Sequence, residues 1–123
     1  EKIHERIREF TKGWGADIVF EHVGEVTWPS SMRSLAHGGR LVTCGATTGP
    51  KASIEIRHLF HKQQTIMGST MGDAAAFTEL LDFLEKGVLK PVLDRTFPMS
   101  EAAEAHRYIE EGKQFGKVVL LPD

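Results

Sequence analysis

Apolar residues recur along this chain at two spacings, one that favours helices and one that favours strands. Helical spacing predicts helices or helical turns at about residues 3–12, 29–35, 58–63 and 77–86, and a last helix from Ser100 onward. Short β-branched runs predict strands at 17–24, 40–45, 65–69 and 117–121, an extended segment at 91–97 and a half-exposed edge strand at 52–56. Strands and helices alternate with short connections, which is typical of parallel sheets built from right-handed crossovers. The pattern therefore predicts an α/β fold.

The same pattern predicts which side chains are buried. The second helix is expected to bury one face, made of Trp28, Met32 and Leu35. The helix near residue 80 carries an i, i+3, i+4, i+7 stripe that is expected to lie in the core: Phe77, Leu80, Leu81 and Leu84. Four glutamates are expected to form a solvated helix face: Glu101, Glu104, Glu110 and Glu111. Ser100 alone is expected to cap that helix, because Ala103 stands where a capping box has an acidic residue.

Composition and charge exclude several classes of function. The chain has 123 residues, a formal net charge of -2 and no long basic run, so a nucleic-acid-binding surface is not expected. Its apolar runs fall short of the roughly 20 residues of a membrane span, and its charged first residues do not form a signal peptide. One cysteine allows no internal disulfide and suits a reducing, cytoplasmic compartment. The absence of an initial methionine fits a cut within a longer protein.

Small, permissive residues end three successive predicted strands, at Val23-Gly24, Cys44-Gly45-Ala46 and Gly68-Ser69-Thr70. Ligands of open parallel sheets bind beyond the carboxyl ends of the strands. One such end is ordinary turn chemistry, but three on the same edge favour a binding crevice. No G-x-G-x-x-G phosphate loop is present. Either the chain binds no dinucleotide, or the pyrophosphate half of the site lies upstream.

Four side chains with reactive chemistry have simpler interpretations. His58 and His61 share a helix face, as metal ligands can, but no third ligand is expected to complete a site, and no metal is predicted. His22 is expected to be a packed, hydrogen-bonded histidine beside the crevice. Cys44 has no cationic neighbour in sequence and is expected to be a small packing residue.

Four segments, in order and at matching spacing, resemble the medium-chain dehydrogenase/reductase superfamily, which includes zinc-type alcohol dehydrogenases and quinone oxidoreductases. Residues 15–24 resemble its "GADVVFDxVG" strand, and residues 35–45 its "L-x-x-G-G-R-x-V-x-x-G" continuation. Residues 60–71 are similar to its "F-x-x-x-x-x-I-x-G-S" segment, and residues 98–121 to its carboxy terminus. The resemblance implies that residues 1–90 are the second, nicotinamide-binding half of a Rossmann domain. Residues 91–123 would return to a catalytic domain through an extended segment, a helix and a strand.

The resemblance also implies a cofactor, NAD or NADP, and specific positions for its contacts. The nicotinamide ribose would lie beside His22 and Val23. The nicotinamide and its carboxamide would be held by Cys44, Gly45 and Ala46. The next strand end would close over the ring with Ser69, Thr70 and Met71. Lys117 would lie near the phosphates or ribose.

The reaction implied is hydride transfer between the nicotinamide and a small-molecule substrate, either an alcohol or aldehyde or a quinone or enone. Any zinc ligands or proton donors of the family would lie in the missing amino-terminal part, so no catalytic residue is assigned here. The chain alone is expected to be inactive and to bind cofactor weakly, because it lacks the phosphate loop. The resemblance implies that the whole protein is a homo-oligomer, a dimer or tetramer. Residues 52–56 would either pair with their symmetry mate across a dimer interface, as in that family, or form an unpaired edge.

Two other functions fit parts of the pattern. A Rossmann-like methyltransferase also places a "D-x-V" strand before a "G-G-R-L" strand, but it has no reason to carry the Gly68-Ser69-Thr70 and Phe115-Gly116-Lys117 segments. A non-catalytic α/β interaction domain would be a stable 123-residue protein with no nucleotide affinity.

Overall fold

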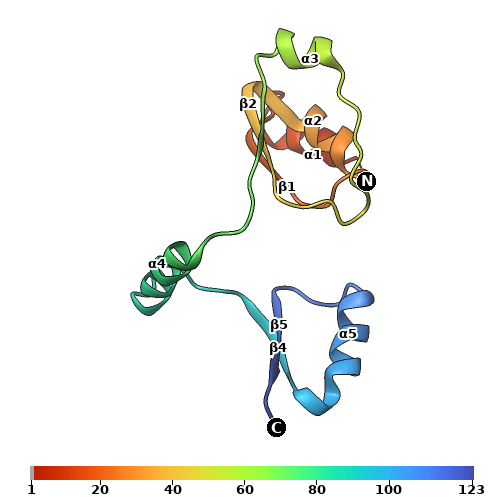
Figure 1. Ribbon diagram of the computed structural model, residues 1–123. Helices are drawn as coiled ribbons and strands as arrows, with labels where there is room; N and C mark the ends of the chain where they lie inside the picture. Colours follow the sequence, from red (N-terminus) through yellow and green to blue (C-terminus); the bar gives the residue numbers. More distant parts are fainter. Residues whose placement is uncertain (1) are drawn as a thin grey trace. The chain divides into compact units, whose positions relative to one another are not determined.

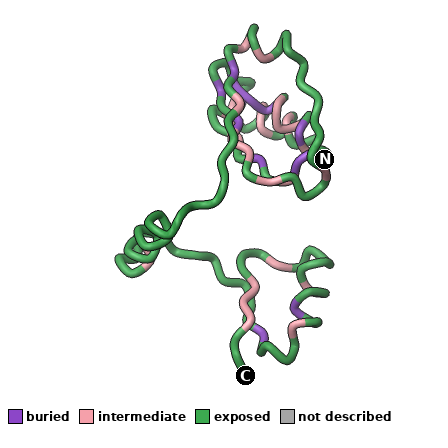
Figure 2. The backbone as a smooth tube through the Cα atoms, viewed as in Figure 1, coloured by how far each residue is buried: buried purple, intermediate pink, exposed green. Residues whose placement is uncertain are grey.

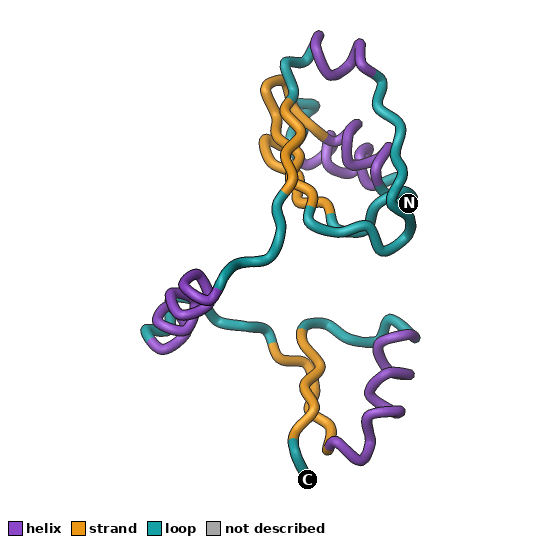
Figure 3. Tube along the Cα trace, viewed as in Figure 1, coloured by secondary structure: helices purple, strands orange, loops and turns teal. Residues whose placement is uncertain are grey.

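The computed structural model describes residues 2–123. Its elements are, in chain order, α1 (Ile3–Phe10), β1 (Ala16–Glu21), α2 (Trp28–Ser34), β2 (Leu35–Thr43), α3 (Ile56–His61), β3 (Thr65–Gly68), α4 (Ala74–Glu85), β4 (Leu93–Pro98), a 3₁₀ turn η1 (Met99–Glu101), α5 (Ala102–Glu110) and β5 (Lys117–Leu121) (Figures 1 and 3). The chain divides into two compact units, the first ending at Met71 and the second beginning at Gly72. All pairs of neighbouring strands are parallel, so the predicted α/β class is confirmed.

The first unit is a three-stranded sheet in the order β1-β2-β3, with helices α1 and α2 beside it (Figure 1). The α2 helix contacts α1, β1 and β2. Its buried Trp28 forms the core with Leu35 and Leu41, the two leucines being fully buried. Partly buried residues pack around them: Val19, Met32 and Ile66. Burial of each leucine stabilises the fold by about 1.5–3 kcal/mol. The predicted burial of Trp28 and Leu35 is confirmed, although Leu35 is the first residue of β2 rather than part of the helix, and Met32 is partly buried.

The β2 strand begins earlier than the sequence pattern predicts. His37-Gly38-Gly39, expected to separate helix from strand, lies within β2, which follows α2 directly at Leu35. The register between β1 and β2 shifts between Ala16 and Ile18. The glycines therefore form part of an irregular strand rather than a loop, because the residues of β2 before and after them pair with β1.

One further expectation in the first unit, the edge strand at 52–56, is wrong. Residues 51–55 form no strand, and α3 begins at Ile56 with Glu55 as its N-cap, its carboxylate accepting the Arg57 N–H. An alternating pattern there reflects an exposed connection rather than a sheet edge. The side chains of Ile18 and Phe20 on β1 are 61% and 67% exposed, so apolar residues of that strand lie on the surface of this unit. Figure 2 shows the buried positions of the unit as short purple stretches in a chain that is otherwise half-buried or exposed.

The second unit contains the parallel pair β4–β5, which α5 connects. Buried Phe97 and Ala105 join the strand pair to α5. The glutamates of the last helix are exposed, as expected. Ser100 does not cap α5, because it lies in η1 and its hydroxyl and N–H both donate to the Asp123 carboxylate.

The α4 helix forms where predicted, capped by the Asp73 carboxylate accepting the Ala76 N–H at 2.8 Å. The prediction that its apolar stripe is core is wrong for this unit. Phe77 is 60% exposed and Leu80 and Leu81 are each 41% exposed, while Leu84 is half-buried. The periodicity identifies the helix correctly but does not supply an element that covers it.

Candidate functional site

The register of the first sheet brings three strand ends to the same edge. Glu21, the last residue of β1, is paired with Thr43 at the end of β2, and Thr43 is paired with Gly68 at the end of β3. The segments that leave these strands start at His22, Cys44 and Ser69, and each carries predicted site residues. The sequence-based prediction of a common edge is therefore confirmed for these three segments.

Backbone hydrogen bonds join the three segments to one another. The Cys44 N–H donates to the Glu21 carbonyl oxygen at 3.1 Å, and the Ser69 N–H donates to the Thr43 carbonyl oxygen at 2.8 Å. Further along the loop, the N–H and hydroxyl of Thr48 both donate to the Val23 carbonyl oxygen at 2.8 Å. These bonds fix the path of the loop after β2 over the end of β1.

Close packing at this edge requires glycine at two positions. A Cβ on Gly45 would lie 2.7 Å from the His22 carbonyl oxygen. Gly24 has a φ of +96°, and a Cβ there would lie 2.9 Å from the Cα of Ala46. Because neither position accommodates a side chain, the backbone itself forms the surface of the edge.

The loop after β2 leaves backbone donors available. The N–H groups of Gly45 and Ala46 have no hydrogen-bond acceptor within residues 2–123. Ala46 is exposed and Gly45 is half-buried, so both donors border accessible space. A planar amide or another acceptor-bearing group can pair with such donors without displacing a protein contact.

Glu21 is the buried charged residue beneath this edge, with only 3% of its surface exposed. One of its carboxylate oxygens accepts the Val23 N–H at 2.8 Å, the Gly24 N–H at 3.1 Å and the Thr27 hydroxyl at 2.8 Å. The other oxygen accepts the Ser31 hydroxyl. Burial raises the pKa of Glu21, but the hydrogen bonds from Ser31, Gly24, Thr27 and Val23 outweigh it and lower the pKa to about 2. The carboxylate is therefore ionised at neutral pH.

The strand pattern does not single out this carboxylate, because Glu21 is only one residue within a predicted strand. A signal was present: an acidic residue at a strand end, a turn glycine three positions later, and hydroxyls at Thr27 and Ser31 on the helix that follows. Hydroxyl and backbone N–H donors at those positions can converge on the carboxylate only if the helix turns back over the strand end. That geometry depends on the packing of α2.

Two of the predicted environments at the edge are wrong. Cys44 is a free, exposed thiol rather than a packing residue, because its backbone leaves the sheet at that point. His22 is exposed, its ring lies 6.2 Å from the Phe20 ring between centroids, and its side chain makes no hydrogen bond to residues 2–123.

The other predicted site residues divide between the two units. Val23 is half-buried, and Ser69, Thr70 and Met71 are exposed where the chain leaves β3. Lys117 is exposed at the start of β5 in the second unit, so its part in the site stays a prediction.

Hollows lie on both sides of the β1 end. One of about 230 Å³ is lined by residues that include Glu21, His22, Val23 and the side chains of Thr27 and Ser31. Another, of about 190 Å³, is lined by Gly24, Thr43, Gly45, Ala46 and neighbouring residues.

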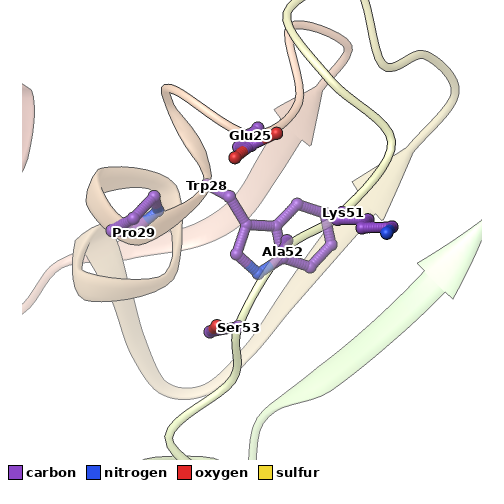
Figure 4. Close-up of a pocket in the computed structure, with 6 residues that line it drawn as sticks. All are labelled: Glu25, Trp28, Pro29, Lys51, Ala52 and Ser53. Carbon is purple, nitrogen blue, oxygen red and sulfur yellow. The ribbon is translucent and has the colours of Figure 1, made fainter.

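A third hollow, of about 290 Å³, adjoins the second and shares Glu25, Trp28 and Ala52 with it. Figure 4 shows the Trp28 indole in this hollow, between Pro29 of α2 and the segment that carries Lys51, Ala52 and Ser53. The edge is thus bordered by shallow depressions rather than by one enclosed cavity.

Neither a metal centre nor a membrane span is found in the part of the chain that the structure describes. Over residues 2–123, no three His, Cys, Asp or Glu side chains are grouped as a metal site requires. His61 instead contacts the neighbouring Phe60 ring, at 4.7 Å between centroids. None of the helices described combines the length and apolarity needed to cross a bilayer.

Comparison with known proteins decides the family. The model of the zinc-binding dehydrogenase family matches residues 3–120. The chain belongs to this family. Its resemblance to medium-chain dehydrogenases, drawn from four sequence segments, is thereby confirmed.

Individual relatives agree with this assignment. A crotonyl-CoA reductase of Streptomyces collinus is 32% identical over 127 residues, covering 100% of this chain and 28% of that protein. The crystal structure of an NAD-dependent alcohol dehydrogenase is 39% identical, with a TM-score of 0.80, over 95% of this chain and 34% of that one. The structure of the 2-octenoyl-CoA carboxylase reductase CinF in complex with NADP and 2-octenoyl-CoA is 33% identical, with a TM-score of 0.82, over 98% and 28%. This zinc-binding dehydrogenase chain thus spans about a third of the length of the proteins it matches, and it matches their carboxy-terminal part.

Proposed function

We propose that this chain is the part of a longer NAD(P)-dependent oxidoreductase that holds the nicotinamide end of the cofactor. The observation that carries the proposal is the pair of acceptor-free N–H groups at Gly45 and Ala46, on the edge where three parallel strands end. The nicotinamide carboxamide offers an acceptor oxygen that suits such donors. The related CinF structure, which contains NADP, supports the same assignment.

The proposed reaction is hydride transfer between the nicotinamide and an alcohol or aldehyde, or a quinone or enone. The cofactor supplies the hydride chemistry when it is bound. The contribution of this chain is positional: donors on the loop after β2 hold the carboxamide, and this orientation decides which face of the ring meets the substrate. The names of the matched reductases and the alcohol dehydrogenase support both substrate classes.

The remaining site residues take supporting roles in the proposal. His22 and Val23 lie beside the nicotinamide ribose, Cys44 joins Gly45 and Ala46 at the ring, and Ser69, Thr70 and Met71 close the far side. Lys117 neutralises phosphate or ribose-linked charge. Any zinc ligands belong to an amino-terminal catalytic domain, to which residues 91–123 return after a domain boundary near residue 90.

Two properties of the whole protein complete the proposal: a homo-oligomer, dimeric or tetrameric, in the cytoplasm. The methyltransferase and interaction-domain alternatives are not favoured, because the family match extends over residues 3–120, including the segment after β3 and the last strand.

The proposal is tested in the full-length parent protein by replacing Ala46 with tryptophan. Ala46 is exposed, so the larger ring should obstruct the edge while changing the free energy of unfolding by no more than about 0.5 kcal/mol. Affinity for NADH and NADPH, measured by calorimetric titration, should fall about tenfold or more, equivalent to ~1.4 kcal/mol. The matched control is Ala75→Trp, at an exposed position of α4, which should leave affinity unchanged. Equal affinities for Ala46→Trp and the unaltered protein would contradict the proposal.

A further inference from the structure

Glu21 carries a buried negative charge that no cation within residues 2–123 neutralises. All four of its hydrogen-bond donors are neutral: the N–H groups of Val23 and Gly24 and the hydroxyls of Thr27 and Ser31. None of the ion pairs in the described part of the chain includes it. Neutral donors stabilise the ionised form but leave a net charge of one electron in place.

A neutral polar side chain would be sufficient if the only task at this position were to connect β1 with α2. An asparagine or serine accepts hydrogen bonds from backbone N–H groups and hydroxyls without the desolvation cost of a charge. Glu21 is only 3% exposed, and its carboxylate accepts four hydrogen bonds, two of them from the N–H groups of Val23 and Gly24 at the strand end. A charge at this position is therefore more than the connection of the two elements requires.

The oxidised and reduced nicotinamide differ in charge. The oxidised ring carries a positive charge, and the reduced ring is neutral. A fixed negative charge behind the binding edge lowers the energy of the oxidised ring and leaves the reduced ring almost unaffected. Because only 3% of the Glu21 surface is exposed, solvent screens this interaction less than it screens the interaction of a surface charge.

We propose that the Glu21 carboxylate biases the nicotinamide edge toward the oxidised cofactor and so sets the ratio of affinities for the two redox forms. This inference rests on the proposed function, because it requires the nicotinamide to lie at the edge formed by Val23, Gly24, Gly45 and Ala46. The hydrogen bonds to Val23 and Gly24 make Glu21 a positioning residue as well, but a positioning effect alone acts on both redox forms equally.

The test uses the full-length parent protein and the dissociation constants of NAD⁺ and NADH, and of NADP⁺ and NADPH. Glu21→Gln keeps the size and one acceptor oxygen of the side chain but removes its charge. It should raise the ratio of the oxidised-form to the reduced-form dissociation constant by about threefold or more at pH 7. Glu21→Asp keeps the charge and should leave this ratio unchanged, even where the shorter side chain weakens the hydrogen bonds and lowers stability.

A second variant covers the case in which Glu21→Gln does not fold. Ser31→Lys leaves Glu21 in place and supplies an ammonium group beside it, so the ratio should shift in the same direction as for Glu21→Gln. Equal changes in affinity for both redox forms, or no change, in whichever of Glu21→Gln and Ser31→Lys folds would overturn the inference. A parent protein that binds neither redox form would instead overturn the proposed function, so the two failures are distinguishable.

Discussion

Gly24 and Gly49 pack backbone against backbone: a Cβ on Gly24 would lie 2.7 Å from the carbonyl oxygen of Gly49. The same carbonyl accepts the Glu25 N–H at 3.3 Å. This contact holds the loop after β2 over the end of β1. Of the atoms of that loop, the Gly49 carbonyl oxygen would lie nearest to a Cβ on Gly24.

Gly24→Ala should therefore destabilise the fold more than the loss of a left-handed glycine alone. The φ of +96° costs an alanine about 1–2 kcal/mol, and the clash with Gly49 adds to it. The matched control is Gly38→Ala, where φ is +72° but no atom lies within 4 Å of the added Cβ, so only the conformational cost applies. Urea unfolding followed by circular dichroism should give a free-energy loss about 2 kcal/mol larger for Gly24→Ala than for Gly38→Ala. Equal losses of unfolding free energy in the two variants would show that the loop moves away from the added methyl group at little energetic cost.

Stability should depend on pH through Glu21. Its pKa is lowered from 4.5 to about 2 in the folded chain, so its contribution is complete above pH 4.5 and is lost as the pH falls toward 2. The shift corresponds to about 3 kcal/mol at neutral pH. The difference in unfolding free energy between the unaltered chain and Glu21→Gln should therefore shrink between pH 5 and pH 3. A difference that is the same at both pH values would contradict the assignment.

The single cysteine should report on the binding edge. Cys44 is exposed and free, so a thiol reagent should label one group per chain without denaturant. In the parent protein, saturating NADH or NADPH should slow labelling several-fold, since the proposed ring position covers this residue. The Cys44→Ser variant gives the background level of labelling. Labelling that requires denaturant, or that the cofactor leaves unchanged, would place Cys44 away from the edge.

The exposed face of the first sheet should cause the isolated chain to self-associate. Phe20 and Met67 are 67% and 47% exposed, and both are cross-strand neighbours of Val42, so they form one apolar row. Phe20→Lys combined with Met67→Lys should lower the sedimentation coefficient of concentrated samples toward that of the monomer. The control pair is Glu104→Gln and Glu110→Gln, which makes the same net change of +2 in charge on the exposed α5 face. If both pairs act alike, net charge rather than the apolar row controls association.

The sequence pattern predicts a strand or helix well where the element's own apolar residues are enough to identify it. The β5 strand is found at Lys117–Leu121 as predicted, and α4 forms from the same apolar stripe that identified it. Residues 52–56 were misread, because alternation also arises in exposed connections that no neighbouring strand pairs with. The burial of the α4 stripe was misjudged because periodicity identifies a face but cannot supply its cover.

Part of the candidate site could likewise be predicted from the sequence, and part of it could not. The common edge of Val23, Gly45 and Ser69 follows from parallel topology, which alternation of strands and helices reveals. The Glu21 carboxylate could not be assigned from local pattern, since its donors lie two to ten residues further along and converge only when α2 turns back onto β1. Glu21 is therefore the part of the site that needed the structure.

The most direct test of the nicotinamide assignment is a titration of the ¹⁵N-labelled chain with reduced nicotinamide mononucleotide, followed by amide NMR shifts. This compound is the half of the cofactor that the edge is proposed to hold, and adenosine monophosphate serves as the control for the other half. The proposed function predicts saturable shifts of the Gly45 and Ala46 amides with the nicotinamide compound, no matching shifts with adenosine monophosphate, and unchanged Gly87 and Gly112 amides in the second unit. Gly45 and Ala46 amides that do not move at millimolar ligand, or that move equally with both compounds, would contradict it.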